Sequence, residues 1–295
     1  MTADSESAVP TAQFYLSQRL RLHYADWGSA QAPPLILVHG GRDQCRSWDA
    51  VARALRAEWN VMALDLRGHG DSAWSSDGNY AMSGYVFDLA EFIHARALGR
   101  VNIIGHSLGG NIALRFAGLY PQLLTRLVVM EGLGPAPQLR AERDAKDFGE
   151  RMRSWIELKR TFAARQERRY ARIADAAVHM RVANPRLSPE QAYGLTVHAL
   201  RENSDGSYRW KYDEYVRLEP LPDLTGSQQR QLWQRITCPT LLMYGRQSWA
   251  SNPATDGRAG FFASATVAVF EDGGHWMHHD CRDEFVAVVR RFLSS

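Results

Sequence analysis

The chain has 295 residues, of which 45% are hydrophobic, and its 35 basic and 32 acidic side chains leave a formal charge of +3. That length is enough for one domain with a large core and an inserted segment. Charges of both signs are spread along the whole chain, which argues against nucleic acid or an anionic membrane as its partner.

The N-terminal residues are polar and lack the apolar run of a secretory signal, so we expect a flexible tail over residues 1–12. No run approaches the roughly 18 apolar residues of a membrane helix, which predicts no membrane insertion. Cys45, Cys238 and Cys281 have neither disulfide-framework nor zinc-site spacing. A cytoplasmic location is the expectation.

Strand-like and helix-like patterns alternate along much of the chain. Segments 14–20 and 22–27 predict an antiparallel hairpin at a sheet edge. Short apolar runs rich in β-branched residues follow at 35–38, 61–64, 101–104, 127–130, 241–244 and 267–270. Helical patterns separate most of them, at 48–58, 82–98, 107–120 and 282–292. This alternation predicts an α/β fold with a mostly parallel central sheet flanked by helices.

The alternation stops between about residues 132 and 235. No strand-like run occurs there, and helical stretches such as 141–173 and 189–201 dominate. We therefore predict an α/β core formed by 13–131 and 236–295, with a helical cap over 132–235 inserted after the sixth core strand.

The strongest chemical signal is Gly105-x-Ser107-x-Gly109, which directly follows a predicted strand and opens a predicted helix. A serine on such a sharp turn is exposed, and the flanking glycines allow the close backbone approach that the turn requires. A hydroxyl needs a base to become nucleophilic at neutral pH. His275 is the best candidate, because it follows the last predicted strand, where parallel sheets carry their reactive groups.

Four segments of the chain resemble the α/β-hydrolase fold superfamily: Val38–Gly41, Asp65–Ser72, Gly105–Gly110 and Gly273–His275. The resemblance covers nearly the full length except the cap. It implies a serine hydrolase whose oxyanion is bound by two backbone amides, those of Gly41 and Leu108 in this chain. It also implies that the segment 65–72 is a structural turn beneath the site rather than a source of catalytic acids.

The third member of the triad, a carboxylate that orients the histidine, departs from the commonest pattern of the superfamily. Ser248 stands where an aspartate is expected after the seventh core strand. Glu131, at the end of the sixth, is the favoured replacement, since haloalkane dehalogenases place their acid there, although those enzymes use an aspartate nucleophile. Asp256 is the second choice, and Asp272 is a weaker one because it lies too near His275 in the same loop.

These residues predict an enzyme that cleaves ester-type bonds of small to medium apolar substrates through an acyl-enzyme, without metal or organic cofactor. An apolar chamber under the cap is one interpretation of five aromatic residues, and ordinary packing is the other: Trp155, Tyr193, Tyr208, Trp210 and Trp249. His106 and His39 are expected to be structural, with His39 also kept as a candidate substrate contact, and His278 and His279 are expected to be structural or to line the pocket.

Three other functions stay open at this stage. The same triad would serve hydrolysis of a carbon–carbon, lactone or amide bond, or acyl transfer, because the fold does not choose among them. A non-catalytic ligand-binding protein is the alternative that Ser248 suggests. A small-molecule substrate is the expected partner, and a homodimer is compatible with the sequence.

Overall fold

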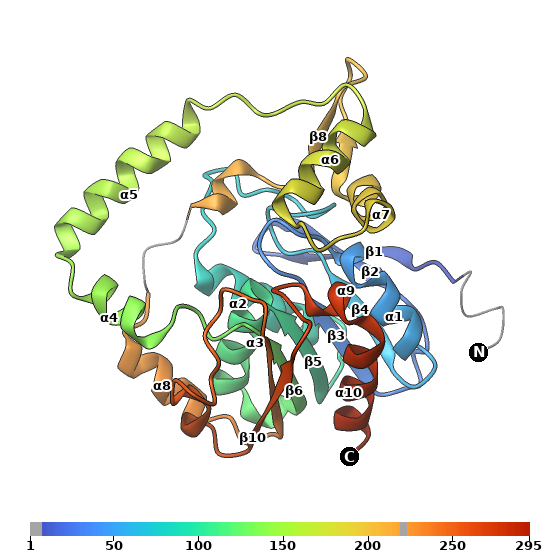
Figure 1. The fold of residues 1–295 in the computed structure, drawn as a ribbon. Coiled ribbons are helices and arrows are strands. Elements are labelled where there is room, and N and C mark those ends of the chain that lie inside the picture. Colours follow the sequence, from blue (N-terminus) through green and yellow to red (C-terminus); the bar gives the residue numbers. More distant parts are fainter. Residues whose placement is uncertain (1–7, 219–222) are drawn as a thin grey trace.

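An eight-stranded sheet runs through the centre of the computed structural model, which describes residues 8–218 and 223–295 (Figure 1). Its strands lie in the order β1-β2-β4-β3-β5-β6-β9-β10. Their bounds are Thr11–Ser17 for β1, Leu20–Asp26 for β2, Pro34–Val38 for β3, Asn60–Leu64 for β4, Val101–His106 for β5, Leu124–Met130 for β6, Thr240–Gly245 for β9 and Ala265–Phe270 for β10.

Only the first hairpin departs from the parallel arrangement. Strand β1 pairs antiparallel with β2, and β2 pairs antiparallel with β4, whereas the other neighbours are parallel. The predicted edge hairpin and the mostly parallel sheet are therefore confirmed. Residues 1–7 of the expected tail lie outside the described residues, and β1 already begins at Thr11.

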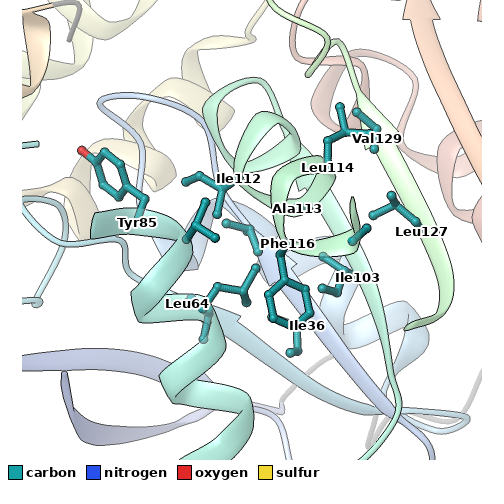
Figure 2. Close-up of a cluster of buried hydrophobic side chains, with 14 of the residues drawn as sticks. Ile36, Leu64, Tyr85, Ile103, Ile112, Ala113, Leu114, Phe116, Leu127 and Val129 are labelled. Atoms are coloured by element: carbon teal, nitrogen blue, oxygen red, sulfur yellow. The ribbon is translucent and has the colours of Figure 1, made fainter. Parts of the chain in front are cut away.

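Helices cover both faces of the sheet, because side chains along each strand alternate between them. Leu35 and Leu37 belong to one buried cluster together with residues of α1 (Asp49–Leu55) and α10 (Arg282–Ser294). Ile36 and Val38 belong to the other, with α2 (Met82–Ala95) and α3 (Leu108–Leu119). Figure 2 shows part of this second cluster, where Phe116 and Ile112 of α3 lie over the sheet. Each such fully buried side chain stabilises the fold by about 1.5–3 kcal/mol.

The segment between β6 and β9 is mainly helical. Its elements are α4 (Pro137–Asp144), α5 (Phe148–Ala163), α6 (Ile173–Ala183), α7 (Pro189–Ala199), β7 (Leu200–Glu202), β8 (Tyr208–Trp210) and α8 (Gly226–Gln234). The described residues also form short 3-10 turns and the one-turn helix α9 (Met277–Asp280). The turns are η2 (Cys45–Trp48), η3 (Pro121–Leu123), η4 (Glu214–Arg217) and η5 (Arg258–Phe261).

This segment differs from the sequence expectation in three ways. The helical stretch 141–173 is divided, because Asp147 accepts the Glu150 amide and starts α5 as a new helix. Strands β7 and β8 form a small antiparallel pair where no strand was predicted. Helix α8 packs against α3, so the end of the inserted segment flanks the sheet.

The parallel strands end at one common edge. The register pairs Val38 with Gly105, His106 with Met130 and Met130 with Met243. The loops that follow β3, β5, β6, β9 and β10 therefore leave the sheet side by side. Among the described residues, no helix combines the length and apolar character needed to cross a bilayer.

Candidate active site

Ser107 occupies a strained turn between β5 and α3. Its φ of +50° and ψ of −112° lie outside the regions that L residues prefer, and its amide donates to the Met130 carbonyl over 2.8 Å. That hydrogen bond ties the turn to the end of β6. The predicted nucleophile therefore stands on a rigid junction of two strands and a helix.

The two glycines of the Gly-x-Ser-x-Gly motif make this turn possible. A Cβ atom on Gly105 would lie 2.6 Å from the Gly109 carbonyl oxygen, and one on Gly109 would lie 2.3 Å from the Val38 carbonyl oxygen. Both distances are far below van der Waals contact, so any larger residue would push α3 away from the strand ends. The motif is thus required by packing as well as by the turn.

The loop after β3 passes directly beside Ser107. A Cβ atom on Gly40 would lie 3.3 Å from the Ser107 Cβ, while one on Gly41 would meet no heavy atom within 4 Å. Leu108 is the first residue of α3, so its amide has no partner inside the helix. The amides of Gly41 and Leu108, which the sequence predicts as the oxyanion donors, thus belong to the two backbone segments that flank Ser107.

Glu131 and His275 meet at the same edge of the sheet. His275 Nδ1 and Glu131 Oε2 are 2.5 Å apart. Because a carboxylate accepts, this nitrogen carries the proton and Nε2 is left with a free lone pair. Glu131 reaches this position through a φ of +48°, which is unusual for a non-glycine residue and turns its side chain back over the strand ends.

The Glu131 carboxylate is buried and fully hydrogen-bonded. Its side chain is 0% exposed, and besides His275 it accepts the Gly245 amide over 2.9 Å and the Ser248 hydroxyl over 2.6 Å. Three donors compensate for the loss of water around the charge. Ser248, at the position where an aspartate was expected, thus contacts the carboxylate that is predicted to take the aspartate's place. This contact was not predicted from the sequence, where the hydroxyl at position 248 is its only local signal.

Neither alternative carboxylate reaches His275. Asp256 binds Arg258, with 2.7 Å between carboxylate and guanidinium, and accepts the Ser251 hydroxyl. Asp272 is exposed, and its carbonyl accepts from Arg186. The Asp256 carboxylate therefore has local structural contacts instead.

Two of the additional histidines are buried in the loops around the predicted triad. His106 donates from Nε2 to the His275 carbonyl over 2.9 Å, and its ring lies 4.6 Å from the His275 ring. Burial lowers the pKa of His106 well below its ordinary value, as it does for His278. Both imidazoles are therefore neutral at neutral pH, as expected for residues with a packing role.

His39 is buried, which favours a structural role over the candidate substrate contact. Its ring is 0% exposed, its Nδ1 bonds the Gly40 carbonyl and its Nε2 accepts the Leu66 amide. With both nitrogens occupied, the ring stabilises the loop that carries Gly41.

Of the five candidate chamber aromatics, Trp249 lies against the predicted base. Its ring centroid is 4.9 Å from that of His275, and the residue is 76% exposed. Trp210 instead donates to the Tyr170 hydroxyl and stacks on Tyr212. The other three lie elsewhere in the inserted segment: Trp155 under the Lys159 ammonium, Tyr193 on an exposed face of α7, and Tyr208 paired with Tyr170.

Comparison with known proteins agrees with this arrangement. The model of the alpha/beta hydrolase family matches residues 35–288. The chain belongs to the alpha/beta hydrolase family. It is accordingly a hydrolase, with a core whose strand order and elbow carry the residues described above.

Relatives of this alpha/beta hydrolase cover most of its length. Esterase Rv0045c of Mycobacterium tuberculosis is 30% identical over 276 residues, which are 91% of this chain and 85% of the relative. A serine hydrolase-like protein of Danio rerio is 27% identical over 90% of this chain and 83% of its own. The thioesterase domain from the curacin biosynthetic pathway superposes with a TM-score of 0.81 at 25% identity, covering 95% of this chain and 98% of the domain.

In this alpha/beta hydrolase the segment 65–72 forms a turn in which every residue except Asp71 is buried. Asp65 accepts His23 Nδ1 over 2.7 Å and the Cys45 amide over 2.7 Å. Burial opposes its charge, yet the hydrogen bond and attraction from His23 hold the pKa of Asp65 below its ordinary value. Asp65 therefore has a structural role within the turn, as the resemblance implies.

Proposed function

We propose that this hydrolase cleaves carboxylic esters with small to medium apolar acyl groups through an acyl-enzyme on Ser107. The hydrogen bond between Glu131 and His275 is the observation that carries the proposal. It supplies the orienting acid that Ser248 cannot provide, and so removes the reason for expecting a non-catalytic protein. The relatives described as esterase and serine hydrolase-like support the same reaction class.

The proposed reaction follows from the roles of these atoms. Ser107 Oγ attacks the ester carbonyl carbon while His275 Nε2 accepts its proton, and Glu131 stabilises the resulting imidazolium. The amides of Gly41 and Leu108 bind the oxyanion, a contribution of about 3–4 kcal/mol per donor in related chemistry. The alcohol then leaves with the proton from His275. Water, deprotonated by the same base, releases the acid and restores Ser107.

The inserted segment is proposed to select the substrate. We place a cap over 132–235, with α8 serving as its attachment to the core. Trp249 supports an apolar substrate, because an indole that is 76% exposed beside the predicted base offers a large apolar surface to an acyl or alkyl group.

Fluorophosphonate labelling tests the nucleophile. We expect one equivalent of label on Ser107 in the wild-type enzyme and none in Ser107→Ala. Ser251→Ala is the matched control, since its hydroxyl bonds Asp256 and lies outside the proposed triad. Full labelling of Ser107→Ala, or none of the wild type, would contradict the proposal.

A panel of nitrophenyl esters of rising acyl length tests the substrate class. We expect turnover that peaks at short to medium chains, with a burst of nitrophenol equal to the enzyme concentration when deacylation is slow. Added methanol separates hydrolysis from acyl transfer, because transfer produces the methyl ester in place of the acid. No turnover with any ester would overturn the assignment to esters.

A further inference from the structure

A buried group of three potential metal ligands lies next to the predicted triad. Asp43, His106 and His278 each offer one ligand atom, and these atoms all lie within 4.8 Å of one another. The residues come from three separate segments: Asp43 from the loop after β3, His106 from the end of β5 and His278 from the one-turn helix α9. They are 8%, 1% and 1% exposed.

The polar atoms of this group are unsatisfied within the described part of the chain. Asp43 Oδ2, His106 Nδ1 and both ring nitrogens of His278 are buried without a hydrogen-bond partner. Buried polar atoms without partners are rare, because each costs about 1–3 kcal/mol. Unsatisfied atoms on all three residues of one cluster point to a ligand that accepts electron pairs.

The hydrogen bond that His106 makes determines what its other nitrogen can bind. Since its Nε2 faces the His275 carbonyl, which only accepts, that nitrogen carries the proton. Nδ1 of the neutral ring is then a lone pair directed into the cluster. Histidine ligands of metals typically donate their other N–H group to a carbonyl or carboxylate in this way.

A second buried group in the molecule provides the contrast. His23, Cys45 and Asp65 also have ligand atoms within 4.8 Å of one another. There, however, Asp65 accepts His23 Nδ1 and the Cys45 amide, so the carboxylate already has its donors. The group around Asp43 instead combines one carboxylate with two imidazoles, and its unsatisfied atoms have no such internal pairing.

We propose that Asp43, His106 and His278 form a binding site for a single divalent transition-metal ion of the zinc class. Two imidazoles and a carboxylate suit Zn²⁺, with the remaining coordination position left to water. The ion would neutralise the buried Asp43 carboxylate and connect the loops that carry Gly41, Ser107 and His275. Bonds of about 2.1 Å place tetrahedral ligands roughly 3.4 Å apart, so binding draws the three side chains inward.

Equilibrium dialysis of the chelator-treated full-length protein against Zn²⁺, followed by metal analysis, tests the site. We expect one tightly held equivalent in the wild type and at least a tenfold weaker affinity in Asp43→Asn. Asparagine has the same shape and still accepts the Gln44 amide, so the metal-free variant should unfold at the same temperature as the metal-free wild type. Cys45→Ala, in the contrasting group, and His94→Gln, at an exposed position, should bind as the wild type does.

Two further measurements make the outcome decisive. Zn²⁺ should raise the melting temperature of the wild type but not that of Asp43→Asn, and Co²⁺ should give visible d–d bands that are lost in His278→Gln. Equal affinity in the wild type and Asp43→Asn would mean adventitious binding at the surface and overturn the proposal. So would absence of a bound equivalent in the wild type. None of these readouts depends on ester hydrolysis, so the outcome is separate from that of the proposed function.

Discussion

The loops at the strand ends and the helices α4 and α5 differ in how deeply their side chains are buried and how many contacts hold them. Glu131 is held by three donors and its side chain is 0% exposed, and Ser107 is pinned to the end of β6. Helices α4 and α5, in contrast, contain no buried residue, and Figure 1 draws α5 well apart from the sheet. The predicted chemistry lies on the rigid part, whereas the proposed substrate selection lies on a weakly packed one. Such a division is expected where precise geometry is needed for catalysis and adaptability for binding.

Replacing Glu131 should have the largest effect, because it removes the acid from the rigid region. We expect Glu131→Gln to lower kcat/KM about 10⁴-fold, equivalent to about 5.5 kcal/mol, since the amide can no longer stabilise the imidazolium. Steady-state hydrolysis of a nitrophenyl ester measures it. Asp256→Asn should keep kcat/KM within a few-fold while lowering the melting temperature, because Arg258 loses its buried partner. The opposite ranking would make Asp256 the acid.

Truncations of apolar residues compare the packing of the two regions directly. Phe116 is 0% exposed and Ile156 on α5 is 41% exposed. Phe116→Ala should reduce the free energy of unfolding by about 3–5 kcal/mol, and Ile156→Ala should change it by less than about 0.5 kcal/mol. Urea denaturation measures both. A large effect of Ile156→Ala would show that α5 packs far more tightly than its exposure indicates. The contrast between a tightly packed core and a weakly packed α5 would then be wrong.

Ser248 offers a sharper test of how the acid is held. Ser248→Ala removes one of three hydrogen bonds to Glu131, so we expect kcat/KM to fall about tenfold, or about 1.4 kcal/mol. The double variant Glu131→Gln with Ser248→Asp should recover part of the activity lost in Glu131→Gln, because a carboxylate then returns to the commoner position. Unchanged kcat/KM in Ser248→Ala would mean that Gly245 and His275 alone position the acid.

The pH dependence of stability should distinguish buried from exposed histidines. Burial lowers the pKa of His69 from 6.5 to about 3. The unfolded chain therefore binds one more proton than the folded chain between these values, and His69 makes stability fall as the pH drops from about 6.5 toward 3, by at most about 1.4 kcal/mol per unit. In urea unfolding between pH 4.5 and 7.5, His69→Asn should flatten this slope and His94→Asn, at an exposed site, should not. Equal slopes in the wild type, His69→Asn and His94→Asn would contradict the lowered pKa of His69.

Local patterns predicted much of the core. Apolar runs between helical patterns gave six strands close to their observed positions, because strands buried on both faces must be apolar along their length. The turn at Ser107 was predictable because glycine is required within two residues on either side. The division of 141–173 was missed, since an Asp147 cap is a single polar residue in a helical pattern. The pairing of β7 with β8 was also missed, because three-residue strands carry almost no periodic signal.

The amino-acid order alone determined the sheet, the elbow and the histidine loop, because their signals are short and depend on neighbouring residues. Tertiary structure decided everything that depends on residues distant in the chain. It brought Glu131 to His275 across 144 positions and Ser248 to Glu131 across 117. It also buried the His39 ring and gathered Asp43, His106 and His278 into one buried group. The physical reason is that hydrogen bonding and burial depend on distance in space, and the register of the parallel strands sets those distances.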